Sequence, residues 1–123
     1  MKWITLIGDE KLTLESIKAI QYYGSIRSHD VWEGRYCVVY SDTDHIFYDY
    51  FDDDNWTSQY NDAEREKIPF ASPHFIMMVY KSGERVKEII QQDNFLRGIY
   101  VDNDSDVIAP IEEFIEMGMP MEP

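Results

Sequence analysis

A chain of 123 residues with 44% hydrophobic and 15% aromatic residues has the length and the apolar content of one folded domain. Its 24 acidic residues outnumber its 11 basic residues, and the net charge of −13 disfavours binding to nucleic acid or anionic membranes, which both require Lys and Arg. No apolar run approaches the roughly 20 residues that cross a bilayer, and the N-terminus lacks a signal-peptide pattern, so we expect a cytoplasmic protein.

The first quarter of the chain predicts a strand followed by a helix. Residues 2–7 are rich in strand-forming side chains, and the pair 8–9 breaks the run. Thr13 suits the N-cap of a helix with one apolar face, and Gly24 is a natural residue to follow a helix C-terminus. We therefore expect this helix to extend from Thr13 to Gly24.

A meander of three antiparallel strands is predicted next, because apolar residues now recur with a period of two. The strands are expected at 25–32, 35–41 and 45–51. In the third strand, Tyr48 and Tyr50 should face one side of the sheet. Phe47, Asp49 and Phe51 should face the other, so that both faces carry aromatic residues.

The second half of the chain alternates between helical and strand patterns. A short helix is predicted at 61–67, and the continuous apolar run 75–80 predicts a central strand that is covered on both faces. Residues 82–92 form either a helix capped by Ser82 or the second arm of a hairpin. If they form a helix, it leads to a strand at 98–101 in a βαβ unit with parallel pairing.

A last helix should begin near Pro110, and the tail 118–123 is expected to be frayed. Together these elements predict a single α+β domain over residues 1–123. Its mixed, mostly antiparallel sheet should have about five to six strands packed against two to three helices.

The single cysteine, Cys37, lies inside an apolar strand pattern. One cysteine can neither form an internal disulfide nor hold a zinc ion by itself. An apolar strand interior also raises the pKa of a thiol, so we expect Cys37 to be buried and inert.

One acidic turn has part of the spacing of a calcium-binding loop, in which places one, three, five and twelve carry acids. Its acids are Asp102, Asp104, Asp106 and Glu113. The glycine required at place six is replaced by Val107, and a strand precedes the turn where an entering helix is needed. A polar strand-to-helix turn is the alternative interpretation.

Other catalytic signals are absent from the sequence. The three histidines, His29, His45 and His74, have no partners at the spacing of known catalytic or metal motifs, and no phosphate-binding glycine loop occurs. We therefore predict a protein without a cofactor and without catalytic activity.

The C-terminal half resembles small bacterial immunity proteins, which accompany polymorphic or contact-dependent toxins. The resemblance lies in the segments PHFI (73–76), VY (79–80), YVDND (100–104) and IEEFI (111–115). It implies a stoichiometric inhibitor that binds a cognate toxin, often a nuclease with a basic cleft. A carboxylate-rich surface would bind such a cleft by mimicking phosphates, and charge would speed the association.

For this function we expect a partner-binding surface on and after the third meander strand, where acids and aromatics alternate. The expected residues are Asp42, Asp44, Asp49, Asp52, Asp53 and Asp54 for charge, with Tyr48, Tyr50, Phe51 and Trp56 as aromatic anchors. Core packing is the alternative role of these aromatics.

Two other functions remain open at this stage. One is a small metal-dependent enzyme or metal-binding protein that uses the turn at 102–106. The other is a structural adaptor or a homodimer that associates through the aromatic faces of its strands.

Overall fold

The computed structural model of the protein describes residues 2–51 and 59–121. The elements in chain order are β1 (Lys2–Gly8), α1 (Leu14–Lys18), β2 (Arg27–Trp32), β3 (Arg35–Ser41), β4 (Asp44–Phe51), α3 (Asp62–Glu66), β5 (His74–Tyr80), α4 (Gly83–Ile90), β6 (Tyr100–Asp102), β7 (Ile108–Pro110) and α5 (Ile111–Glu116). None of the helices within the described ranges is long and apolar enough to span a membrane.

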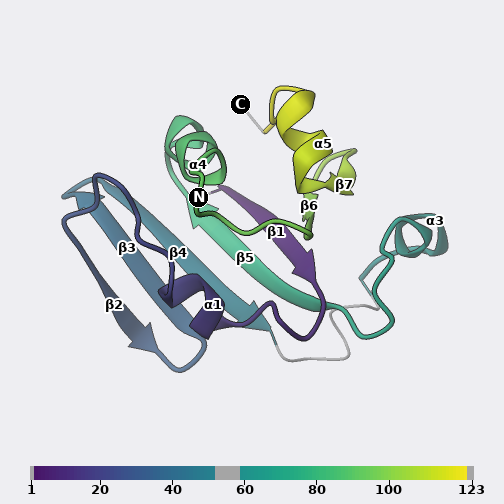
Figure 1. The fold of residues 1–123 in the computed structure, drawn as a ribbon, viewed down its shortest axis with the longest axis horizontal. Coiled ribbons are helices and arrows are strands. Elements are labelled where there is room, and N and C mark those ends of the chain that lie inside the picture. The colour runs from purple at the N-terminus through teal and green to yellow at the C-terminus, as the bar shows by residue number, and fades with distance from the viewer. Residues whose placement is uncertain (1, 52–58, 122–123) are drawn as a thin grey trace.

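The strands form one sheet in the order β2-β3-β4-β5-β1-β6-β7, and all the pairings between the described strands are antiparallel. This confirms the α+β class, the meander of β2, β3 and β4, and the central place of β5 (Figure 1). The seven strands exceed the expected five to six, and the four helices of the described residues exceed the expected two to three. The additional strand, β7, has only three residues and is too short to show a period of two.

The parallel pairing expected after α4 does not form. β6 pairs with β1 in antiparallel register, with Thr5 opposite Asp102 and Leu6 opposite Val101. The other edge of β1 pairs with β5, so β1 lies between β5 and β6. The two strands on either side of α4 therefore run in the same direction without being neighbours, because the N-terminal strand separates them.

The N-caps of α1 and α4 are the residues that the sequence indicates, and α3 is capped in the same way. Thr13, Asn61 and Ser82 each accept a hydrogen bond from a backbone N–H in the first turn of their helix. Residues 82–92 are therefore not a hairpin arm. Helix α4 buries Val86 and Ile90 on one face, as the helical spacing of its apolar residues predicts.

Helix α1 is shorter than expected and ends at Lys18 instead of near Gly24. After this helix the chain turns back, so that Tyr22 is buried and its hydroxyl donates a 2.9 Å hydrogen bond to the carbonyl of Ile17. Gly24 has a φ of +85° and lies in the turn that leads to β2. The glycine is therefore required by the turn and does not mark the end of the helix.

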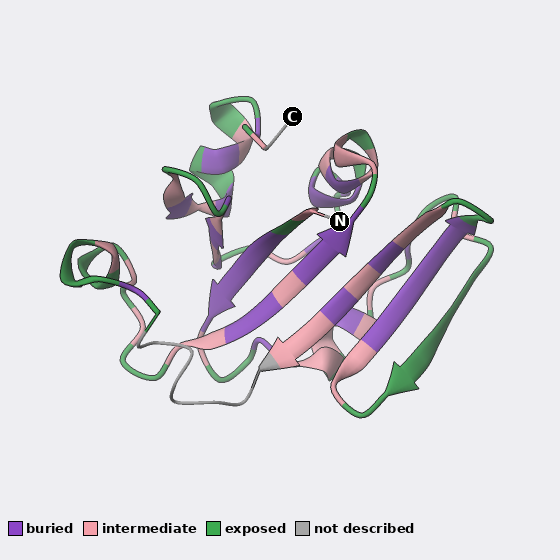
Figure 2. Ribbon diagram, turned by 180° about the vertical axis from the view of Figure 1, so that it is seen from behind, coloured by how far each residue is buried: buried purple, intermediate pink, exposed green. Residues whose placement is uncertain are grey.

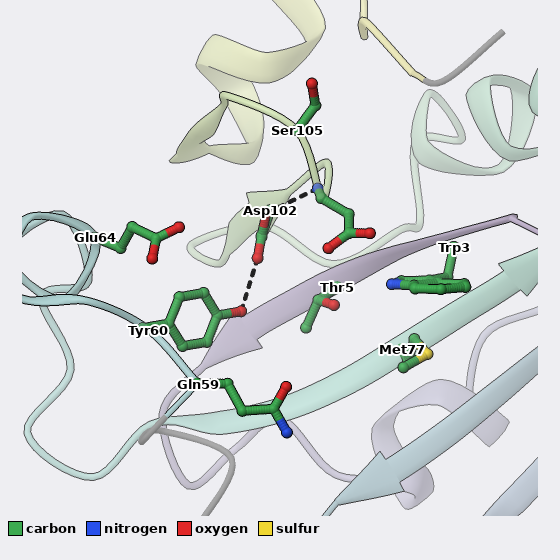
Figure 3. A pocket seen from close by; sticks show the side chains of 9 residues that line it. Trp3, Thr5, Gln59, Tyr60, Glu64, Met77, Asp102 and Ser105 are labelled. Atoms are coloured by element: carbon green, nitrogen blue, oxygen red, sulfur yellow. Dashed lines mark hydrogen bonds between the residues drawn. The ribbon is translucent and has the colours of Figure 1, made fainter.

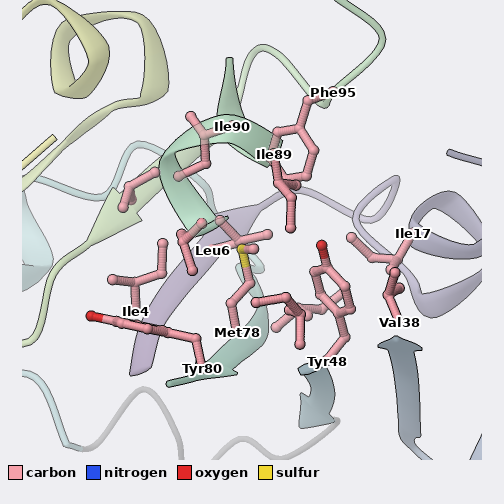
Figure 4. Close-up of a cluster of buried hydrophobic side chains, with 14 of the residues drawn as sticks. Ile4, Leu6, Ile17, Val38, Tyr48, Met78, Tyr80, Ile89, Ile90 and Phe95 are labelled. Atoms are coloured by element: carbon pink, nitrogen blue, oxygen red, sulfur yellow. The ribbon is translucent and has the colours of Figure 1, made fainter. Parts of the chain in front are cut away.

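Three helices, α1, α4 and α5, cover one face of the sheet and enclose the main core (Figure 1). Leu6, Tyr48 and Met78 of the sheet meet Ile17 of α1 and Ile89 of α4 in this core (Figure 4). Burial of these side chains is the largest stabilising contribution that the fold makes.

The opposite face of the sheet has no described helix over β3, β4 and β5 (Figure 2). We call this surface the open face. Because side chains alternate along a strand, its residues are those that point away from the main core. They are Trp3 and Thr5 of β1, Arg35, Cys37 and Val39 of β3, His45, Phe47 and Asp49 of β4, and Met77 and Val79 of β5. At one end of the open face, Tyr60, before α3, packs with Ile7 and Phe75 in a second, small core.

The tail is ordered over residues 118–121, contrary to the expectation that it is frayed. Met119 is buried in the main core, and its backbone N–H donates to the carbonyl of Phe114. The side-chain amide of Asn103 donates a 3.0 Å hydrogen bond to the carbonyl of Pro120. Residues 119–120 are thus attached both to α5 and to the turn after β6.

Candidate functional site

Two of the three described acids that were expected to face a partner are paired within the chain. Oδ2 of Asp44 accepts a 2.9 Å hydrogen bond from Nε of Arg85, and Oδ1 of Asp49 lies 2.9 Å from Nε of Arg35. Asp42 is exposed in the turn between β3 and β4. Asp44 and Asp49 are therefore not available as free charges, which corrects the expectation for these two residues.

Arg35 has several partners on the open face. Its guanidinium lies 4.2 Å from the centre of the Phe47 ring and 5.0 Å from that of Trp32. The ion pair with Asp49 lacks the angle of a hydrogen bond, because the Nε–H does not point at the carboxylate. Burial raises the pKa of Asp49, and Arg35 opposes this shift only in part.

The expected aromatic anchors Tyr48 and Tyr50 belong to the helix-covered face. Tyr48 is fully buried in the main core, and Tyr50 is half-buried against that core, with its hydroxyl 3.4 Å from Nδ1 of His74. Neither ring presents itself to a partner, so the core-packing alternative is correct for both. Asp52, Asp53, Asp54 and Trp56, together with the side chain of Phe51, lie outside the described residues.

The acidic turn after β6 uses its side chains to hold its own backbone. Oδ1 of Asp102 accepts from the N–H of Asp104, and Oδ1 of Asn103 accepts from Ser105 and Val107. Glu113 is exposed on α5. In the part of the chain that the structure describes, Asp102, Asp104, Asp106 and Glu113 do not converge as metal ligands. The arrangement is that of a polar turn.

The cysteine and histidines occupy structural positions. Cys37 is buried as expected, and this burial raises the pKa of its thiol. His29 is exposed on the edge strand β2, and the His45 ring lies 6.2 Å from the Phe47 ring. Nδ1 of His74 is within 3.3 Å of the carbonyl oxygen of Leu12.

A cavity of about 240 Å³ opens at the end of the open face, between β1, α3 and the turn after β6 (Figure 3). Thr5 lies at its centre, with Met77 opposite on β5 and Asp102 opposite on β6. We call this cavity the Thr5 pocket. Its lining consists of Trp3, Thr5, Gln59, Tyr60, Glu64, Met77, Asp102, Asp104 and Ser105.

The Thr5 hydroxyl is an unused polar group at the base of this pocket. Thr5 is only 3% exposed, and its side chain points into the cavity (Figure 3). Its hydroxyl makes no hydrogen bond within residues 2–51 and 59–121, and it is not among the side-chain atoms that the protein seals from solvent, so it is open to the cavity. A hydroxyl at the base of a cavity can bond either to water or to a polar group of a ligand that enters and displaces the water.

Two contacts fix the acidic wall of the pocket. The Tyr60 hydroxyl donates a 2.8 Å hydrogen bond to Oδ2 of Asp102, while the Tyr60 ring stacks on Phe75. Glu64 is held by the capping box of α3, in which its N–H donates to Asn61 and its Oε1 accepts from the Asn61 N–H. The carboxylates of Asp102 and Glu64 are therefore positioned before any ligand arrives.

The electrostatics of the Thr5 pocket favour a cation. The carboxylates of Glu64, Asp102 and Asp104 line the cavity, and its lining within residues 2–51 and 59–121 includes no Lys or Arg. Burial and the nearby charge of Asp102 raise the pKa of Tyr60 far above its ordinary value, so the hydroxyl stays protonated. The exposed ring of Trp3 adds an aromatic surface, which attracts cations to its face.

Sequence reasoning missed Trp3, Thr5, Tyr60 and Glu64 as site residues. The alternation of side chains along residues 2–7 places Trp3 and Thr5 on one face of a strand. This is the one signal in the sequence that connects the two residues. It gave no indication that Asp102 would lie opposite Thr5, because the strand before the acidic turn was expected to pair with another partner.

Comparisons with known proteins supply no relative for this chain. They found no matching family model, no similar curated protein and no similar solved structure.

Proposed function

We propose that this chain is a non-catalytic protein-binding domain that recognises a cationic protein through its open face. In its specific form it is an immunity-type inhibitor that neutralises a basic toxin such as a nuclease. The observation that carries the proposal is the Thr5 pocket, an acidic cavity with an aromatic wall on the face of the sheet that no described helix covers.

The distribution of the side chains supports binding by this face. Trp3 is 40% exposed at the pocket, and Trp32 of the edge strand β2 is 61% exposed beside Arg35. Exposed aromatic side chains are enriched among the residues that dominate interface energies. The open face can thus be covered by a partner, while α1, α4 and α5 pack against the other face.

The charge of the chain supports a basic partner. A net charge of −13 speeds the approach of a cationic protein and disfavours anionic ones. Among the described residues that line the pocket there is no His, the commonest general base, to activate the Ser105 hydroxyl. This composition supports recognition of a charged group over catalysis.

Affinity capture tests the proposal. The purified chain is immobilised, exposed to a lysate of its own organism at low salt and eluted at high salt. Trp3→Glu and Met117→Glu serve as matched baits, because both positions are similarly exposed, at 40% and 46%, and both variants add one negative charge.

We expect the wild-type and Met117→Glu baits to retain the same basic protein in a one-to-one complex, and the Trp3→Glu bait to lose it. If the captured protein is a nuclease, equimolar wild-type chain should abolish its activity. Equal retention by Trp3→Glu, or no saturable partner for the wild-type chain, would contradict the proposal.

A further inference from the structure

We infer that the Thr5 pocket receives the guanidinium group of an arginine side chain of the partner. The inference rests on the proposed function and names the group that the open face recognises. It follows from four properties of the pocket: its size, its charge, the spacing of Trp3 and Thr5, and the unused hydrogen-bonding capacity of its walls.

The size of the pocket fits the end of one side chain. Cavities that hold drug-sized ligands measure roughly 300 to 1,000 Å³, and the Thr5 pocket measures about 240 Å³. Trp3, Thr5 and Met77 of the open face line it, so a side chain of a partner on that face can enter it without rearrangement of the sheet.

The spacing of its residues fits a flat cation. Trp3 and Thr5 point to the same side of β1, and alternate residues of a strand are about 6.7 Å apart. A planar group stacked on the Trp3 ring can therefore reach the Thr5 hydroxyl at its edge. Guanidinium stacks on aromatic faces in this way, whereas ammonium is a compact point charge that remains strongly hydrated.

The walls offer several acceptors at once. The Thr5 hydroxyl has a free acceptor, and Oε2 of Glu64 accepts no hydrogen bond from residues 2–51 or 59–121. Each Asp102 oxygen accepts one hydrogen bond and retains a second lone pair. Guanidinium carries five N–H donors in a fixed plane and matches such a set better than the three donors of an ammonium group.

Nuclear magnetic resonance tests the inference on the full chain with N-acetyl-arginine-N-methylamide as the probe. The citrulline analogue is the matched control, because it keeps the shape and loses the charge, and the lysine analogue tests the preference for guanidinium. From the binding energy usual for a ligand of this size, we expect a dissociation constant of about 1 mM for the arginine probe.

The predicted result is a saturable shift of the Trp3 indole and Thr5 amide signals with the arginine probe. The lysine analogue should bind more weakly, and the citrulline analogue should cause no saturable shift. Equal shifts with arginine and citrulline, or arginine-induced shifts confined to residues outside the pocket, would overturn the inference.

Two variants of Thr5 distinguish the effect of losing the hydroxyl from an effect on the fold. Thr5→Val keeps the side-chain shape and removes the hydroxyl, and Thr5→Ser keeps the hydroxyl. We expect arginine binding to weaken at least about tenfold in Thr5→Val and to be retained in Thr5→Ser, with both spectra otherwise unchanged. Unchanged binding in Thr5→Val would contradict the assigned role of Thr5.

The same experiments distinguish this inference from the proposed function. If the captured partner binds the chain through Trp3 while the arginine probe fails to bind, the pocket inference is wrong and the proposed function stands. If the probe binds as predicted and no basic protein is captured, the proposed function fails and the guanidinium site stands.

Discussion

The hydroxyl of Tyr60 donates a 2.8 Å hydrogen bond to Oδ2 of Asp102, and this bond ties the segment before α3 to the end of β6. Hydrogen bonds to charged groups contribute more than neutral ones, so Tyr60→Phe should lower the free energy of unfolding by about 1.5 to 3 kcal/mol. Urea denaturation followed by circular dichroism measures this loss.

Tyr100→Phe is the matched control for this change. The Tyr100 ring packs edge-on against Phe70 at a centroid distance of 5.8 Å, and its hydroxyl makes no hydrogen bond with the residues that the structure describes. Its removal should change the free energy of unfolding by less than about 0.5 kcal/mol. Equal losses for Tyr60→Phe and Tyr100→Phe would show that the Tyr60–Asp102 bond is not a stabilising contact.

Truncation of Tyr48 should cost far more stability than truncation of Trp32. Tyr48 is fully buried, so Tyr48→Ala leaves a cavity and should cost about 3 to 5 kcal/mol of folding free energy. Trp32 is exposed and contacts Arg35 through its ring, so Trp32→Ala should cost about 1 kcal/mol or less. Thermal or urea unfolding of both variants checks the order, and a smaller loss for Tyr48→Ala would contradict the buried position of this ring.

Cys37 should be protected from alkylation in the native protein. It is 3% exposed, and its burial raises the pKa of the thiol, although Arg35 and Arg27 oppose the shift. We expect iodoacetamide to react at least about a hundredfold more slowly in buffer than in urea, because reaction requires local opening of the sheet.

A cysteine at Ser41, the exposed end of the same strand, provides the comparison for this reaction. In a Cys37→Ala background, Ser41→Cys should be alkylated at similar rates with and without urea. Rapid alkylation of native Cys37 would mean that the open face gives reagents direct access to β3.

The fold should lose stability at alkaline pH through its buried tyrosines. Burial raises the pKa of Tyr40 to about 12 and also raises those of Tyr22 and Tyr48 above the ordinary value of about 10. The folded state thus favours the neutral phenols. Their contribution is fully present below about pH 10, where unfolded tyrosines begin to ionise, and it is lost as the pH rises through about 12.

Absorbance at the tyrosinate band, recorded together with circular dichroism, measures this transition. Some of the nine tyrosines should ionise near pH 10 with the fold intact, and the rest only at higher pH as the fold is lost. Ionisation of all nine near pH 10 without a change in circular dichroism would contradict the burial of these hydroxyls.

Local patterns in the sequence predicted most of the elements. The period of two predicted the meander, and the caps Thr13 and Ser82 marked the starts of α1 and α4, because these signals depend only on neighbours in the chain. The pairing of Thr5 with Asp102 depends on which strand lies beside β1, and that choice is made by the whole sheet.

The same difference between local and long-range information explains why the sequence did not predict the candidate site. The density of acids and aromatics near β4 predicts a binding surface there. In the structure, however, Asp49 is paired with Arg35 and Tyr48 faces the main core. The Thr5 pocket draws its residues from β1, the α3 region and the turn after β6, so no local motif announces it.

The dissociation constant of the captured partner, measured by calorimetry with the wild-type chain and two variants, tests the central claim most directly. Trp3→Ala removes the aromatic wall of the Thr5 pocket, and Met117→Ala truncates a similarly exposed residue after α5. We predict that Trp3→Ala raises the dissociation constant at least about thirtyfold, the size of an interface hot spot, and that Met117→Ala leaves it unchanged. Equal constants for the two variants would contradict recognition through the open face.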